Sequence, residues 1–279
     1  MTLTTTLLVL LAALLHATWN AFVRANADRL SMVGYISLGS AIAVLPFVPF
    51  VPLPTREVWP ILALSIALHT GYKLFLARAY EHGALGHVYP IARGTAPLVV
   101  TLAGLLFLGE KLPPFALVGV LLITGGIMSL AAQRNGTQKA TPEAIIYSLI
   151  TSLFIAAYTI NDGLGGRAAV TALSYTVWLF VLDGLAFMAV IAWRRNFLAF
   201  IRPTRTSLLG IGGGIIGALG YGIVIWAMSA NPLGPVAALR ETSVIFAALI
   251  SAFVMKERFG VMGILAAITV AVGVMLLRF

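Results

Sequence analysis

Apolar runs recur from one end of the chain to the other, separated by short polar gaps. A helix needs about 20 mostly apolar residues to cross the hydrocarbon core of a bilayer. We therefore predict an all-α membrane protein with ten transmembrane helices. The predicted spans are residues 3–23, 31–51, 59–79, 86–108, 115–132, 144–161, 168–192, 207–230, 233–255 and 259–277.

The composition agrees with lipid as the main solvent. Hydrophobic residues make up 60% of the chain and charged residues 10%, whereas a soluble domain carries about 25% charged residues. The net charge is +9, but the basic residues lie in the gaps between apolar runs. That distribution is typical of loops at a membrane surface and argues against a nucleic-acid partner. The first apolar run lacks a basic leader and is too long for a signal peptide, so we expect it to be retained.

Several chemistries are excluded by what the sequence lacks. The chain has no cysteine, which excludes disulfides, thiolate nucleophiles and thiolate metal sites. It has no Gly-Lys-Ser or Gly-Lys-Thr phosphate loop, so ATP is not expected to drive it directly. The longest gaps, 133–143 and 194–205, are too short for a folded domain. We expect no enzyme activity and no cofactor, and any function must lie within the helix bundle.

The first five predicted spans resemble the second five in order. When Glu110 at the end of the fourth span is paired with Glu257 at the end of the ninth, further positions match across all five spans. The matched pairs are Thr18/Thr159, Asn20/Asn161, Tyr35/Tyr175, Gly71/Gly220, Tyr72/Tyr221, Gly86/Gly234, Arg93/Arg240, Thr95/Thr242 and Gly126/Gly273. Because five is odd, the second copy must enter the membrane from the opposite side, which makes an inverted repeat. We predict a first repeat over 1–132, a linker over 133–143 and a second repeat over 144–279.

This doubled unit, in which Gly109-Glu110-Lys111-Leu112 closes the fourth span, resembles the EamA domain of the drug/metabolite transporter superfamily. Three other motifs share the resemblance: His16-Ala17-Thr18-Trp19-Asn20, Tyr89-Pro90-Ile91-Ala92-Arg93-Gly94 and Ala238-Leu239-Arg240-Glu241-Thr242. The resemblance covers the whole chain. Within the superfamily, the chain is most similar to YddG-type amino-acid exporters. It implies a multi-pass protein of the bacterial inner membrane. In the second Gly-Glu motif Lys256 replaces glycine, which we expect to alter only a surface turn.

Two arginines lie deep within predicted spans. Arg93 and Arg240 are about 10 Å from the ends of their spans at 1.5 Å per residue, where a charge must face protein or water. Their guanidinium groups could clamp an anionic group of a substrate. Alternatively each forms a structural salt bridge, for example to Glu241 or Asp183. The other ionisable residues assigned to the spans are His16, His69 and Lys73.

Further candidate substrate-binding residues surround these arginines in the predicted bundle. His16 and Asn20 lie four residues apart on one helix face, with Trp19 between them, and Asn161 is the repeat counterpart of Asn20. The aromatic candidates are Tyr72, Tyr89, Tyr158, Tyr221 and Trp226. The polar residues could instead hydrogen-bond neighbouring helices, and Tyr80 is more typical of an interfacial aromatic belt.

Proline and glycine mark irregular spans. Pro90, Gly94 and Pro97 predict a break or kink in the fourth span, and broken helices are typical of transporter binding sites. Pro46 and Pro49 predict a kink in the second span. The glycines of the eighth span, including Gly210–Gly214 and Gly213–Gly217, allow either tight helix packing or a sliding surface.

The sequence therefore favours a secondary transporter that exports amino acids, above all large apolar and aromatic ones, by alternating access. The alternative is a multidrug-type exporter of organic cations or of other small metabolites. We expect a central cavity lined by the first, third, fourth, sixth, eighth and ninth spans, with the fifth and tenth as scaffold. Eleven Lys and Arg residues follow the odd spans against four elsewhere outside the membrane, which predicts both termini outside. The sequence leaves the coupling ion open.

Overall fold

The computed structural model describes residues 1–24, 28–83, 85–131, 141–194, 197–254 and 260–278, and within these it is all-helical. Helices occupy every predicted span. They are α1 (Leu3–Arg24), α2 (Arg29–Val44), the 3-10 helix η1 (Leu45–Phe50), α3 (Val58–His82), α4 (Leu85–Gly94), α5 (Ala96–Phe107), α6 (Pro114–Ala131), α7 (Pro142–Ala168), α8 (Ala172–Arg194), α9 (Phe197–Phe200), α10 (Arg205–Ala230), α11 (Leu233–Glu241), α12 (Ser243–Val254) and α13 (Gly260–Leu276).

Most of these helices are long and apolar enough to cross a bilayer. Among the described residues, eight candidate spans meet that condition, and two shorter apolar helices, Leu3–Thr18 and Gly260–Leu276, lie near the chain ends. The chain is therefore a multi-pass membrane protein with eight to ten spanning helices. The exact number of ten stays a prediction.

Local sequence explains where several helices begin. The Thr141 side chain accepts a hydrogen bond from the amide of Ala144, and Pro142 occupies the first turn of α7, where its missing N–H costs nothing. Thr204 and Ser207 form a capping box at the start of α10, which satisfies amides that have no partner within the helix.

Three of the predicted spans are interrupted. The second continues from α2 into η1, with Pro49 inside the 3-10 helix. The fourth is divided into α4 and α5 at Thr95, and Pro97 lies in the first turn of α5. The ninth is divided into α11 and α12 at Thr242, which the sequence did not predict. Both threonine hydroxyls donate to a carbonyl of the preceding half-helix, Thr95 to Ile91 at 2.5 Å and Thr242 to Leu239 at 2.6 Å.

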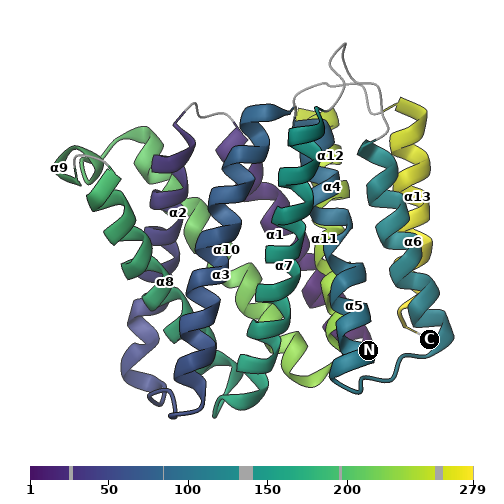
Figure 1. Ribbon diagram of the computed structural model, residues 1–279, viewed down its shortest axis with the longest axis horizontal. Helices are drawn as coiled ribbons and strands as arrows, with labels where there is room; N and C mark the ends of the chain where they lie inside the picture. The colour runs from purple at the N-terminus through teal and green to yellow at the C-terminus, as the bar shows by residue number, and fades with distance from the viewer. Residues whose placement is uncertain (25–27, 84, 132–140, 195–196, 255–259, 279) are drawn as a thin grey trace.

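The helices stand side by side in one bundle (Figure 1). Helices α6 and α13 pack against each other at one edge, and α2 and α8 lie toward the opposite edge. Helices α3 and α7 form a long contact near the centre, as do α2 and α10. The edge position of α6 and α13 fits the expected scaffold role of the fifth and tenth spans. The N- and C-terminal ends lie near the same end of the bundle (Figure 1).

The glycines of α10 allow that helix to approach α2 closely. A Cβ atom added to Gly214 would meet the amide nitrogen of Ser40 at 2.8 Å, and the Ser40 hydroxyl donates to the Gly214 carbonyl at 3.0 Å. Gly210 faces the side chains of Tyr35 and Met32 in the same way. Of the two interpretations of this glycine-rich span, tight packing describes the observed contact.

Candidate functional site

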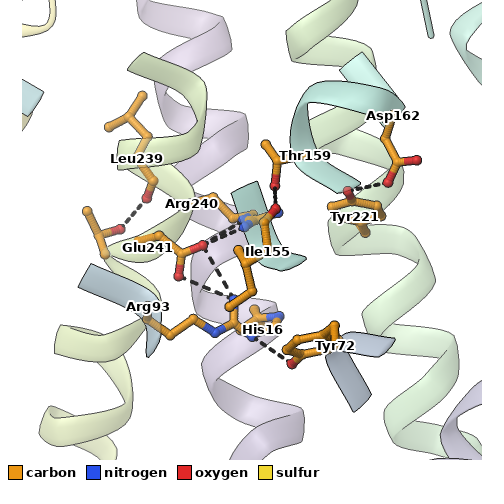
Figure 2. Close-up of polar contacts among 11 residues, drawn as sticks. His16, Tyr72, Arg93, Ile155, Thr159, Asp162, Tyr221, Leu239, Arg240 and Glu241 are labelled. Carbon is orange, nitrogen blue, oxygen red and sulfur yellow. Dashed lines mark hydrogen bonds and ion pairs between the residues drawn. The ribbon is translucent and has the colours of Figure 1, made fainter. Parts of the chain in front are cut away.

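One buried carboxylate is shared by two arginines at the centre of the bundle (Figure 2). Arg93 Nη1 donates to Glu241 Oε2 at 3.2 Å, and Arg240 donates to Glu241 Oε1 through Nε at 3.0 Å and Nη2 at 2.5 Å. The Glu241 side chain has no exposed surface, and the arginine side chains are 3% and 4% exposed. Of the two alternatives for the arginines, the ion pair to Glu241 is therefore present.

The two helix breaks position these arginines. Arg93 lies in the last turn of α4 and Arg240 in the last turn of α11. The last turn of a helix presents carbonyl groups without helical partners and the negative end of the helix dipole. Each half-helix therefore stabilises a cation at its end. Since both half-helices end beside Glu241, the two guanidinium groups meet at one carboxylate.

Three predicted site residues contact Arg93. Its Nη2 atom lies 2.6 Å from His16 Nε2 and 3.4 Å from the Tyr72 hydroxyl. The Tyr89 ring lies below the guanidinium, whose Cζ atom is 5.5 Å from the ring centroid. These contacts bring α1, α3 and α4 together around one cation.

Two predicted tyrosines contact Arg240. Its Cζ atom lies 5.6 Å from the ring centroid of Tyr158 and 5.7 Å from that of Tyr221. Cation–π contacts within about 6 Å of a ring stabilise a desolvated guanidinium. The rings of Tyr158 and Tyr221 are themselves 6.1 Å apart and nearly perpendicular. Together with the residues around Arg93 they form a single cluster, which we call the arginine cluster: His16, Tyr72, Tyr89, Arg93, Tyr158, Tyr221, Arg240 and Glu241.

A second buried carboxylate, Asp162, was missed by the sequence analysis. The sixth span was predicted to end at residue 161, but α7 continues to Ala168. Asp162 Oδ1 accepts from the hydroxyls of Ser65 and Tyr175, and Oδ2 contacts His69 Nε2 at 2.9 Å and accepts from Tyr221 at 2.6 Å. In Figure 2, Glu241 lies on one side of Arg240, and Tyr221 with Asp162 lies on the other.

A further, partly buried ion pair joins α3 to α8. Lys73 Nζ donates to both carboxylate oxygens of Asp183, at 3.0 and 2.8 Å, and to the Ser37 hydroxyl at 2.9 Å. Its ammonium also lies 4.6 Å from the centroid of the Phe187 ring. Asp183 is therefore engaged by Lys73 and does not pair with Arg93 or Arg240.

The remaining predicted residues lie elsewhere or are not described. The Asn161 amide donates to the Ile61 carbonyl at 2.8 Å, so it links α7 to α3. Trp226 is 45% exposed and lies on the outside of the bundle, so its assignment to a central cavity is wrong. The side chains of Trp19 and Asn20, and all of Lys256 and Glu257, lie outside the described residues. Glu241 and both arginines are enclosed by protein, so they line no open cavity in this structure. The predicted central cavity therefore stays a prediction.

Glu110 is nearly buried where the two halves of the chain meet. Its carboxylate accepts from Arg167 Nη2 at 2.7 Å and from the amide of Leu233 at 2.9 Å, and its side chain is only 8% exposed. It therefore holds the end of α5 against the start of α11. This is a helix-capping contact between the two halves of the chain.

Comparison with known proteins agrees with this architecture. A crystal structure of another protein superposes with a TM-score of 0.76 at 16% sequence identity, covering 99% of this chain and 96% of that chain. At that identity the likeness shows a shared fold. The model of the EamA-like transporter family matches twice, over residues 3–132 and 142–279. These two matches span nearly the whole sequence, and the chain therefore belongs to the EamA-like transporter family of membrane transporters for small metabolites.

Proposed function

We propose that this transporter exports amino acids across the bacterial inner membrane by alternating access, with the arginine cluster as the site for the substrate carboxylate. One observation carries the proposal: two buried arginines share a single carboxylate. The cluster therefore holds one more cation than anion, and an anionic group on the substrate would balance it. Arginine is suited to this task because its planar fork matches a carboxylate.

The surrounding rings supply the rest of such a site. Tyr72, Tyr89, Tyr158 and Tyr221 all contact the two arginines or each other. Their faces could pack against the side chain of a large apolar or aromatic amino acid. Such walls select weakly between apolar side chains, so we expect a broad substrate range that favours large ones.

Helix packing supports an inverted repeat as the basis of alternating access. Helix α3 packs on α7, and its repeat counterpart α10 packs on α1. Helix α4 contacts α7 and its counterpart α11 contacts α1, just as α5 contacts α7 and its counterpart α12 contacts α1. One equivalent pair differs: α2 packs along α10 much more extensively than α8 packs on α3. A transporter whose halves exchange roles would differ in this manner between its two sides.

The same geometry disfavours export of organic cations. That alternative requires a carboxylate that faces the cavity without a cation beside it. Glu241 is bonded to two arginines and Asp183 to Lys73. Asp162 has no exposed surface and is enclosed by Ser65, His69, Tyr175 and Tyr221. An organic cation entering the arginine cluster would meet excess positive charge.

Transport in liposomes tests the proposal. Protein reconstituted in vesicles loaded with unlabelled phenylalanine should accumulate external labelled phenylalanine by counterflow. Phenethylamine, which lacks the carboxylate, and tetraphenylphosphonium, an organic cation, should compete poorly. Strong competition by tetraphenylphosphonium with no phenylalanine counterflow would favour the multidrug alternative and refute this one.

Arg93→Lys separates binding from structure, because it keeps the charge and removes the fork. A charge-assisted hydrogen bond is worth about 1.5–3 kcal/mol, so its loss should raise the apparent KM roughly tenfold to a hundredfold. The melting temperature should change little. Unchanged KM with reduced melting temperature would assign Arg93 a purely structural role.

A further inference from the structure

The buried network around Asp162 lies beside the arginine cluster and is not explained by substrate binding alone. The Asp162 carboxylate is completely buried, although the His69 side chain that contacts it is 15% exposed. Its partners come from three helices: Ser65 and His69 from α3, Tyr175 from α8 and Tyr221 from α10. A buried carboxylate is energetically costly unless it is paired or hydrogen-bonded. The four partners of Asp162 offset that cost, and the question is what the buried carboxylate does.

We propose that Asp162 and His69 form a proton-binding site that exchanges a proton with water during the transport cycle. With His69 neutral, its Nε2–H group donates to ionised Asp162 and the pair has a charge of −1. Addition of one proton makes the pair neutral overall, and its release on the other side of the membrane restores the starting state. The proposal rests on the proposed transport function, because it names the ion coupled to it.

The contacts of Asp162 favour a proton over a metal ion. A carboxylate offers about four lone-pair sites, and four groups already contact the two oxygens of Asp162, two on each. A sodium ion would need several of those lone pairs. No group of three or more His, Asp or Glu residues within the described part of the chain is arranged to hold a metal. A proton needs only the short Asp162–His69 contact.

The other titratable groups near the pair lie on the helices packed against α7. Helix α3 adds Lys73, which is held by Asp183 of α8. Helix α10 contributes Tyr221, α11 contributes Arg240, and α4 contributes Arg93 with Tyr89. Helix α5 contains no titratable residue. Apart from His69 itself, the cations next to the pair are already engaged by Glu241 or Asp183.

A chain of aromatic contacts connects the pair to the arginine cluster. The His69 ring stacks on Tyr158 at 4.2 Å, and Tyr221 donates to Asp162 while its ring faces Arg240 at 5.7 Å. With Asp162 ionised, the interior of the bundle holds three buried carboxylates, Asp162, Asp183 and Glu241, against two buried arginines, Arg93 and Arg240, and the partly buried Lys73. Protonation of the pair leaves one cation in excess, so binding of a proton and of a charged substrate must influence each other.

Infrared spectroscopy tests proton binding without any need for transport. In lipid-reconstituted protein, an imidazolium ring band that is absent from His69→Gln should appear on acidification, because the ionised Asp162 carboxylate stabilises the added proton on the His69 ring. Asp162→Asn should remove this band, whereas Glu143→Gln, at an exposed position in the first turn of α7, should leave it. A band that persists in Asp162→Asn, or the lack of any band in the wild type that depends on His69, would overturn the proposal.

Vesicles with an entrapped pH-sensitive dye test coupling. Addition of phenylalanine to wild-type vesicles should change the internal pH, and an imposed pH gradient should drive phenylalanine accumulation. Asp162→Asn should keep phenylalanine counterflow within about threefold of the wild type and lose both proton responses. Equal loss of counterflow and of proton responses would make Asp162 a structural or substrate residue and overturn the proposal. Wild-type phenylalanine transport without a proton response would also overturn it and leave the proposed function standing.

The sign of the pH change identifies which end of the substrate Asp162 senses. A proton that moves together with phenylalanine indicates that protonation favours the substrate carboxylate at the arginines. A proton that moves in the opposite direction indicates that the negative charge of the pair attracts the substrate ammonium without direct contact, and that protonation weakens this attraction. Either sign supports the site. If phenylalanine is not transported but the infrared band titrates and depends on Asp162, the proton site stands and the proposed amino-acid substrate fails.

Discussion

Removal of the charge on Glu241 should strongly lower the stability of this transporter. Glu241→Gln keeps the shape of the side chain and leaves Arg93 and Arg240 buried without their shared counter-ion. Loss of one partner from a buried ion pair costs about 3–5 kcal/mol. For a domain of about 150–250 residues, each 1 kcal/mol shifts the melting temperature by roughly 2–4 °C, so we expect a fall of roughly 6–20 °C.

The melting temperature of the detergent-solubilised protein, followed by tryptophan fluorescence, provides the assay. Glu143→Gln is the matched control, since Glu143 lies exposed at the start of α7, and its effect should stay within about 0.5 kcal/mol. Phenylalanine should raise the melting temperature of Glu241→Gln more than that of the wild type, because the substrate carboxylate then replaces the missing charge. A variant as stable as the wild type would refute the inference that Glu241 balances two buried cations.

Three further predictions concern packing and the other buried charges. Gly214→Ala should cost about 1–3 kcal/mol, because its Cβ would meet the backbone of α2 at 2.8 Å, whereas Gly212→Ala, with nothing within 4 Å, should leave the melting temperature unchanged. Glu110→Gln should lower stability by about 1–3 kcal/mol and retain counterflow in the folded protein; folded protein without transport would contradict its structural role. Asp183→Asn should destabilise by about 3–5 kcal/mol, and the double variant with Lys73→Met should recover most of that loss in the same melting assay.

The sequence predicted the position of every helical span because long apolar runs leave few alternatives. It also predicted the interruption of the fourth span from Pro90, Gly94 and Pro97. The matching interruption at Thr242 has no proline nearby and was not predicted. The repeat contained the necessary signal, since it pairs Thr242 with Thr95, at which the fourth span breaks. Local propensity alone does not break the ninth span, so internal symmetry is the better predictor here.

Asp162 was missed for a different physical reason. The segment that follows it contains Gly163, Gly165 and Gly166, and glycine costs about 1 kcal/mol in a helix relative to alanine, so a loop was predicted. The helix continues because these glycines lie against other helices. Gly163 faces Leu233 and Gly166 faces Ile225, so tertiary packing compensates for the poor helix propensity. The partners of the buried charges were equally inaccessible from sequence, because they depend on which helices adjoin.

The sharing of Glu241 suggests how substrate binding and movement are connected in the proposed mechanism. Arg93 belongs to α4 in the first half of the chain, and Arg240 and Glu241 are neighbours at the end of α11 in the second half. Movement of one half against the other therefore leaves the Arg240–Glu241 contact intact and stretches the Arg93–Glu241 contact, which is already the longer at 3.2 Å. A substrate carboxylate could take the place of Glu241 at Arg93 during that movement. The empty transporter would then resist the movement, because it would have to bury an unpaired arginine, whereas the loaded transporter would not.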